Sequence, residues 1–464
     1  MPPNTGRPTS HFYKTYLKGE FFYGFWNMVS RGVGFLNTLI TLTQLTVYQY
    51  GVFQLILASF SGLSIFIGLG GETIRNDILR YIGENKVSFA KKLFYESFFL
   101  RLTIGIGLWA SVFFGAPYFF SNYGPDFIYY IQIISFLFLH DSILPSIQQV
   151  LEADKKFNLI ASRASLSKIV QLGILGYYFV FQDAGLREVL LSLVIASFVS
   201  LLFMLVIVFK RYYVIWKKIE STQDALIRRL LLSYGKWELL RPAAAKLTNF
   251  VQVWITKFFI GTEAVALFSV AQTMIGMIAN LLPINTLSAL VPREVADRDR
   301  MQKIYNTGTK YLVLLSILMG LVALVLTPPF IRFFFPKYIA VLPLFSVMLV
   351  TLPIIALSAL AGIFLVVYRK QGFLLFHKIL KGIISSLLIA LLVPMLGLWG
   401  LPVQTIILST ILYVILYVYM WRADIAISIQ LREIFRFDNT DRELFRNVIS
   451  DGRKYLARWL PKRN

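Results

Sequence analysis

Two apolar stretches decide the fold class: YLVLLSILMGLVALVLT at Tyr311–Thr327 and LPVQTIILSTILYVILYVYM at Leu401–Met420. Neither contains a charged residue, and a helix of about 20 such residues crosses the hydrocarbon core of a bilayer. Lipid offers no hydrogen-bond partner to the backbone, so a span is either a helix or part of a closed barrel. Barrel strands alternate apolar and polar positions, and these stretches do not. The sequence therefore predicts an all-α polytopic membrane protein.

The rest of the chain has the same character, because its 464 residues are 57% hydrophobic and only 15% charged, against about 25% charged in soluble proteins. We expect about twelve transmembrane helices, at residues 21–45, 48–70, 94–120, 126–150, 164–181, 188–209, 237–260, 264–292, 308–328, 338–367, 373–394 and 401–420. The 338–367 span is long and contains Pro343 and Pro353, so we expect it to be tilted, kinked or broken.

Lysine and arginine are distributed unevenly between the two sets of connecting segments. With both termini on one side, that side holds 35 of them, and the opposite side holds only Arg187, Arg332 and Lys337. The positive-inside rule then places both termini in the cytoplasm. This topology accounts for the formal charge of +22, and no basic soluble domain exists to bind nucleic acid. The external connections are all short, which excludes a sizeable external domain.

The longest internal loop divides the spans into two sets of six. We therefore expect a cytoplasmic N-terminus at 1–20, an N-lobe at 21–209, a basic linker at 210–236, a C-lobe at 237–420 and a tail at 421–464. The tail has apolar residues at helical spacing with arginine and lysine between them. This pattern is typical of an amphipathic helix that lies on the cytoplasmic leaflet or packs beneath the bundle.

Short matches indicate that the two lobes are repeats in the same orientation, an arrangement common in transporters. Tyr23-Gly24-Phe25-Trp26 resembles Tyr234-Gly235-Lys236-Trp237, and Tyr50-Gly51-Val52-Phe53 resembles Val265-Ala266-Leu267-Phe268. The two matches need slightly different offsets, which implies a short gap between them. We call the shift that places Tyr50 on Val265 the repeat offset. Chance or shared membrane composition is the alternative explanation for matches of this length.

Several basic residues lie deep within the predicted spans, where a charge costs at least about 2.5–3.5 kcal/mol and marks a binding site or a water-filled path. The repeat offset also places Arg31 on Lys246 and Asn37 on Gln252. Bases at equivalent depths of two repeats would face one central cavity. Such a cavity would suit an anion, especially a phosphate or diphosphate.

Arg101 and Lys381 are further candidates for the same anion site. The alternative for the deep bases is structural, a salt bridge with a carboxylate such as Glu96 or Glu238. Bases close to the ends of spans are better explained as anchors that reach the interface.

His140 and Asp141 stand together in the middle of the fourth span. A histidine beside an aspartate can exchange protons near neutral pH, so proton coupling is one hypothesis. Adjacent residues point in different directions on a helix, and pairing with a nearby base is the alternative. The chain has no cysteine, no phosphate-binding loop and no metal-ligand spacing of its three histidines. We therefore expect neither an enzyme nor a cofactor or metal.

The segment Asn27-Met28-Val29-Ser30-Arg31-Gly32-Val33-Gly34-Phe35-Leu36-Asn37, followed by Tyr50-Gly51-Val52-Phe53, resembles the opening of a known transporter family. That family is the polysaccharide-transporter branch of the MOP superfamily, the Wzx-type flippases for O-antigen and related oligosaccharides. Twelve spans in two six-helix lobes and bases in the first and seventh spans also fit it. No single motif is diagnostic, and the same superfamily includes MATE multidrug exporters and the lipid II flippase.

The resemblance implies a flippase of the bacterial inner membrane that moves an undecaprenyl-diphosphate-linked oligosaccharide outward by alternating access, for lipopolysaccharide or another surface polysaccharide. The cationic cavity would hold the diphosphate and sugars while the lipid tail stays among the membrane lipids. The resemblance also implies a monomer that works beside glycosyltransferases and a polysaccharide polymerase. The seventh and eleventh spans lack a deep carboxylate cluster for sodium, which leaves the coupling ion open.

A MATE-like multidrug or small-solute exporter on the same fold is the main alternative, and deep carboxylates without deep bases would favour it. A membrane-embedded glycosyltransferase or polymerase usually needs a large external loop, which the chain lacks. A structural membrane protein has no reason to bury bases at repeat-related depths. The balance of deep charges favours the flippase.

Overall fold

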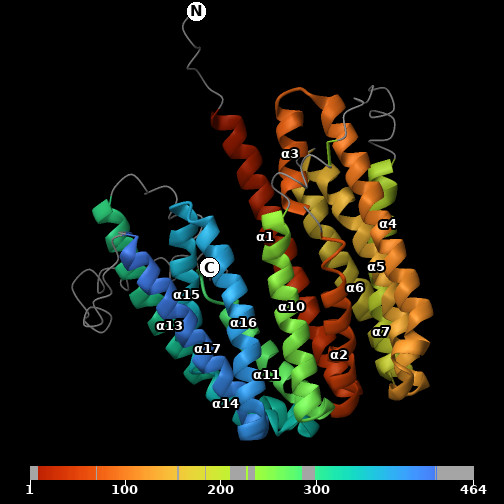
Figure 1. Ribbon diagram of the computed structural model, residues 1–464, viewed down its shortest axis with the longest axis vertical. Coiled ribbons are helices and arrows are strands. Elements are labelled where there is room, and N and C mark those ends of the chain that lie inside the picture. Colours follow the sequence, from red (N-terminus) through yellow and green to blue (C-terminus); the bar gives the residue numbers. More distant parts are fainter. Residues whose placement is uncertain are drawn as a thin grey trace, which may run out of the picture. The chain divides into compact units, whose positions relative to one another are not determined.

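The structure is a computed structural model that describes residues 9–68, 71–153, 156–182, 184–209, 226–227, 236–284, 298–423 and 425. Within these residues every regular element is a helix (Figure 1). The predicted tail at 421–464 and the predicted linker at 210–236 lie almost entirely outside the described residues.

The helices of the first half, in chain order, are α1 (Thr9–Gln44), α2 (Val47–Leu63), α3 (Gly71–Gly83), α4 (Val87–Phe119), η1 (Ser121–Tyr123), α5 (Pro125–Ala153), α6 (Phe157–Phe181) and α7 (Leu186–Val208). The second half has α10 (Lys236–Phe259), α11 (Thr262–Ala279), α13 (Arg298–Phe334), η5 (Pro336–Tyr338), α14 (Val341–Met348), α15 (Thr351–Val367), α16 (Gln371–Leu396), η6 (Gly397–Trp399) and α17 (Gly400–Arg422).

The helices confirm an all-α polytopic membrane protein. Among the described residues, seven helical stretches are long and apolar enough to cross a bilayer, and the bent pair α14–α15 makes an eighth. Each of the twelve predicted spans overlaps a helix or, for 338–367, this pair, although α2 ends well before residue 70 and the last residues of 264–292 lie outside the described residues. The 45° bend between α14 and α15 confirms that the proline-containing span is broken. The full count of twelve membrane crossings stays a prediction.

The chain forms two compact units. Unit 1 contains residues 1–272, 327–344 and 378–404, and unit 2 contains 273–326, 345–377 and 405–464. Unit 1 therefore holds all of the predicted N-lobe together with α10 and parts of later helices. The lobe boundaries drawn from the sequence stay a prediction.

The helices of unit 1 approach one another closely at small residues. The most extensive contacts are those of α1 with α6 and of α4 with α5, followed by those of α7 with α6 and α5. Gly105 of α4 faces the Ser142 side chain of α5, and a Cβ atom at Gly105 would lie only 2.5 Å from the Ser142 Cβ. Small residues permit such contacts, and these contacts hold membrane helices together where no hydrophobic effect operates between them.

The helix ends support the internal repeat. α1 ends at Gln44 and α10 at Phe259, and the helices that follow them begin at Val47 and Thr262. The repeat offset relates both pairs of positions. Arg31 and Lys246 consequently lie equally far from the C-terminal ends of their helices. The same shift in residue number therefore relates the two bases and the ends of the two helices that carry them.

Unit 2 has its own apolar core between α13, α15 and α17. Tyr305 packs its ring edge-on against Phe364, with centroids 5.1 Å apart. Leu312, Leu360 and Leu416 are among the buried side chains of the same cluster. Beside the core, Phe373 of α16 stacks on Tyr419 of α17 with ring planes 4° apart.

The contact between α2 and α11 gives a first prediction. A Cβ atom at Gly51 would clash with the Thr262 carbonyl oxygen, so we expect Gly51→Ala to lower the melting temperature of the purified protein markedly. Gly107 of α4 has nothing within 4 Å of its Cβ position, and Gly107→Ala should be neutral or stabilising, since alanine is favoured over glycine by roughly 1 kcal/mol in a helix. Equal melting temperatures for the two variants would contradict the close approach.

Candidate functional site

The second span is interrupted in the structure. α2 ends at Leu63 and α3 begins at Gly71. In the link, the N–H groups of residues 65–68 each donate to the carbonyl three residues earlier, at 3.1 to 3.4 Å. The regular helix of the second span therefore ends before residue 70, and α3 follows it as a separate, polar helix.

The sequence did not predict this interruption. We expected a span to residue 70 and a loop over 71–93, whereas the structure has an amphipathic helix, α3, over Gly71–Gly83. The loop expectation was wrong because α3 buries Ile74 and Ile78 against Ala90 and Leu93 of α4. Residues 71–83 are too polar for a span, yet this apolar stripe stabilises them as a helix. Gly68 is the last described residue of the link, and Gly71 is the first residue of α3.

Lys246 lies at the start of the interruption. Its Nζ donates to the Ser64 hydroxyl at 2.8 Å, and Ser64 is the residue that follows the last turn of α2. Further along α10, Phe250 covers Gly62 and the Trp254 Nε1 donates to the Ser59 hydroxyl at 3.0 Å. A cation at the C-terminal end of a helix is favoured by the helix dipole. The ammonium of Lys246 therefore has a fixed position at the broken end of α2.

Arg31 and Asn37 occupy different sides of α1. Asn37 is only 4% exposed, and its amide nitrogen donates to the Lys168 carbonyl at 3.0 Å and to the Gln171 side chain at 3.3 Å. This amide is thus engaged in the interface between α1 and α6. Arg31 is exposed and lies roughly 120° around the helix from Asn37 at 3.6 residues per turn.

The other predicted residues of the anion site are dispersed in unit 1. Gln252 is half-buried on α10, and its backbone carbonyl accepts the Thr256 hydroxyl. Lys381 is exposed on α16. Arg101 of α4 is only 1% exposed, so it does not line an open surface. Glu96, suggested as a salt-bridge partner of the deep bases, pairs with Lys92 and accepts the Ile227 N–H.

His140 and Asp141 do contact each other, although they are adjacent on α5. The His140 Nδ1 lies 2.9 Å from the Asp141 Oδ1, and the imidazole is buried while Asp141 is partly exposed. Arg163 of α6 is close enough to Asp141 to interact electrostatically. Pairing of Asp141 with such a base stays the alternative to proton coupling. Proton coupling through the pair stays a prediction.

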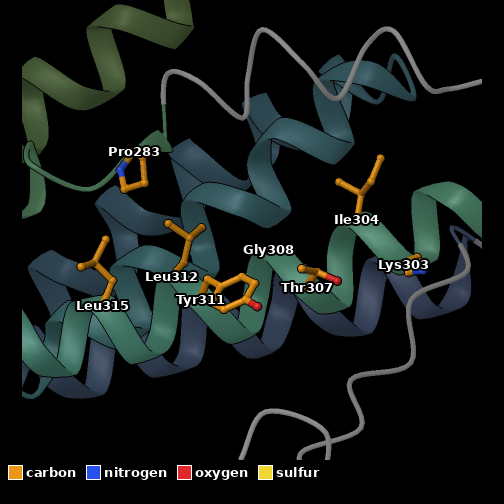
Figure 2. Close-up of a pocket in the computed structure, with 8 residues that line it drawn as sticks. All are labelled: Pro283, Lys303, Ile304, Thr307, Gly308, Tyr311, Leu312 and Leu315. Carbon is orange, nitrogen blue, oxygen red and sulfur yellow. The ribbon is translucent and has the colours of Figure 1, made fainter. Parts of the chain in front are cut away.

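Unit 2 contains an apolar groove along the first turns of α13, with a volume of about 460 Å³. Figure 2 shows Lys303 and Ile304 at one end of the groove and Leu315 and Pro283 at the other. Thr307, Gly308, Tyr311 and Leu312 line the middle. Sequence reasoning missed this groove because its lining residues resemble any other apolar helix face.

The fold defines a class of protein. It is similar to an inward-facing multidrug resistance MATE family transporter of the MOP superfamily, with a TM-score of 0.73 and 13% identity over 85% of this chain and 94% of that one. It is also similar to the lipid II flippase MurJ in an inward closed conformation (TM-score 0.69, 13% identity, 89% of each chain). An outward-facing MATE family transporter matches with a TM-score of 0.60 and 15% identity, over 88% of this chain and 96% of that one.

The chain therefore has the fold of MOP superfamily transporters. The profile of the family described as "Polysaccharide biosynthesis protein" matches residues 16–296, which is more than half of the chain. The protein belongs to this family. A comparison with curated protein sequences finds no match.

The exposure of Arg31 and the burial of Arg101 give a second prediction. Because the chain contains no cysteine, single Arg31→Cys and Arg101→Cys variants can be labelled without background. We expect a charged, water-soluble thiol reagent to modify the cysteine at position 31 quickly and the one at position 101 only after denaturation. Rapid labelling at position 101, or none at position 31, would contradict this assignment.

Proposed function

We propose that this protein is a flippase that moves an undecaprenyl-diphosphate-linked oligosaccharide across the bacterial inner membrane by alternating access. Membership of the polysaccharide biosynthesis family and the MOP transporter fold support a role in moving a lipid-linked saccharide. The repeat unit of O-antigen or another surface polysaccharide is the substrate class that we infer.

The observation that carries the proposal is the position of two bases at equivalent depths. Arg31 and Lys246 lie equally far from the ends of two helices that the repeat offset relates. Lys246 is fixed at an interrupted helix. A diphosphate carries two or more negative charges, and guanidinium and ammonium groups bind its oxygens by charge-assisted hydrogen bonds. An acidic site would serve a cationic drug better, so the bases favour an anionic substrate.

The groove of unit 2 suits the other part of such a substrate. Its lining is almost entirely apolar, and Lys303 lies at one end (Figure 2). From Lys303 to Leu315 the helix rises by roughly 18 Å at 1.5 Å per residue. This length accommodates several isoprene units of a polyprenyl chain. The proposed substrate is an amphiphile of this kind.

The proposal includes the topology and partners expected from the sequence. Both termini lie in the cytoplasm, so the lipid-linked oligosaccharide is taken up from the leaflet where glycosyltransferases assemble it. A polysaccharide polymerase then uses the exported unit, and the flippase acts as a monomer among membrane lipids. His140 and Asp141 are the candidates for proton coupling.

The test of this function is a third prediction. In proteoliposomes, the wild-type protein should flip a fluorescent undecaprenyl-diphosphate oligosaccharide, and Arg31→Ala and Lys246→Ala should each reduce the rate at least tenfold by removing a charged contact, worth about 1.5–3 kcal/mol. Lys86→Ala is the control, because Lys86 is exposed beside α3 and pairs only with Glu84 among the described residues. Its rate should equal that of the wild type.

Two results would overturn the proposal. If the wild type moves no lipid-linked saccharide but exports a small organic cation, the MATE-like exporter is the correct function. If the wild type flips the lipid and both alanine variants flip it equally fast, the bases are not the anion site.

The groove gives a fourth prediction. Thr307→Trp places an indole in the middle of the groove, and we expect it to slow flipping severalfold by excluding the hydrocarbon chain. Leu318→Trp is the matched control, since Leu318 is 58% exposed on the same helix and is not one of the groove's lining residues. Equal flipping rates in the two variants, both correctly folded, would contradict a role of the groove in binding the lipid tail.

A further inference from the structure

Lys168 lies in the middle of a membrane-spanning helix. α6 is apolar enough to cross the bilayer over Asn158–Phe181, and Lys168 is roughly three turns from either end of it. The span predicted at 164–181 began later and placed this lysine near its end, where it would be an anchor at the interface. In the structure it is too deep for that role, and a charge at such depth marks a binding site or a water-filled path.

The ammonium of Lys168 has no counter-charge in the part of the chain that the structure describes. Its Nζ makes no hydrogen bond or ion pair with another described residue, and no carboxylate among these residues is close enough to interact with it. The lysine is half-buried. In contrast to the guanidinium of Arg101, its Nζ is not one of the unpartnered polar atoms that are fully enclosed. The charged end is therefore accessible to a ligand.

The backbone around Lys168 is fixed against α1. One turn before the lysine, the Ser165 hydroxyl donates to the Trp26 carbonyl at 2.7 Å. The Asn37 amide donates to the carbonyl of Lys168 itself at 3.0 Å, and to the Gln171 side chain one turn later. These contacts advance in the same direction along both helices, so α1 and α6 run parallel. The fold therefore determines where the lysine side chain begins.

The side chain of Lys168 leads from this interface towards the side of α1 that carries Arg31. Its Cδ lies 4.0 Å from the position that a Cβ atom would occupy at Gly34, so the stem passes over this glycine. Successive residues of a helix are about 100° apart, which places Gly34 between Asn37 and Arg31, roughly 60° from each. Arg31 is one turn before Gly34, and helix side chains tilt towards the N-terminal end. The two basic side chains therefore lie on the same side of the α1–α6 pair.

Packing alone does not require a lysine at this position. The contact with Gly34 involves the Cδ of the stem, and the hydrogen bond from Asn37 uses a backbone carbonyl, which any residue offers. An apolar side chain of similar length would make the same contacts without the cost of a charge within a span. The ammonium therefore serves something outside the interface of α1 and α6.

We propose that Lys168 binds the substrate together with Arg31 and makes the site selective for a diphosphate over a monophosphate. This inference rests on the proposed function, and it adds a specificity-determining residue to the anion site. A diphosphate that is esterified at both ends carries two negative charges, and the corresponding monophosphate carries one. The fork of Arg31 and the point charge of Lys168 match the two phosphate groups. With a monophosphate, one base would keep an unpaired charge within the membrane, which is unfavourable.

The test is the affinity of the full-length purified protein, in detergent, for two probes, measured by fluorescence anisotropy. Both probes carry a farnesyl chain and the same fluorescent sugar, joined through a diphosphate in one and a monophosphate in the other. We expect the wild type to prefer the diphosphate about tenfold, as one additional charge-assisted contact implies. Lys168→Met, which keeps a stem of similar length, should bring the two affinities close together. Lys168→Arg, which keeps the charge, should retain most of the preference.

Two further comparisons separate binding from structure. Lys156→Met is the matched control, because Lys156 is the N-cap residue of the same helix, and this variant should keep the preference of the wild type. Gly34→Leu should reduce the preference without removing a charge, since its side chain displaces the lysine stem. Gly34→Ala should keep it, because its Cβ makes only an ordinary van der Waals contact. A purely structural role of Lys168 would weaken both probes equally and leave the ratio unchanged.

An unchanged preference in Lys168→Met would overturn the inference, and so would a wild type that binds the two probes equally. Flipping in proteoliposomes separates this inference from the proposed function. If the wild type flips the lipid-linked saccharide and Lys168→Met flips it equally fast at limiting substrate, only the role of Lys168 is wrong. If the wild type shows the preference, loses it in Lys168→Met, and flips no lipid-linked saccharide, the diphosphate site stands and the proposed function is wrong.

Discussion

Hydrocarbon cannot hydrogen-bond, and this constraint governs the whole molecule. It restricts the spans to helices, and it requires every interruption of a helix to be satisfied from within the protein. Serine and threonine hydroxyls in the spans donate to carbonyls three or four residues earlier, as Thr41 and Ser192 do. Lys246 donates to Ser64, which follows the last turn of α2, and Trp254 donates to Ser59 within α2.

The same constraint explains why the deep bases are informative. A base within a span is costly unless it reaches water, a partner or an anion. In the structure, three of the deep bases lie in different surroundings. Arg31 is exposed, Lys246 is anchored at a helix end, and Arg101 is enclosed. These are three different physical environments, and they assign the three bases to different roles. Exposed and anchored bases can receive a large substrate, whereas an enclosed base does not line an open binding surface.

The features that could be predicted from the sequence depend on local composition, and those that could not depend on contacts between helices. Helix positions, the broken span with Pro343 and Pro353, and the repeat offset could be predicted, because each depends on local composition or on comparison of the chain with itself. The helix α3, the interface position of Asn37 and the enclosure of Arg101 could not. Each depends on a neighbour in another helix, such as Leu93 for α3 or Gln171 for Asn37.

The sequence by itself determined the class of the protein, since apolar stretches of sufficient length have no stable alternative to membrane helices. It also predicted that bases recur at equivalent positions of two repeats, because a repeat can be found by comparing the chain with itself. Only the tertiary structure decided which of these bases remain accessible. Lys246 and Ser64 are far apart in the chain, yet they share a hydrogen bond. Their contact exists because α10 packs on α2, and such packing depends on shape complementarity between helices that composition does not record.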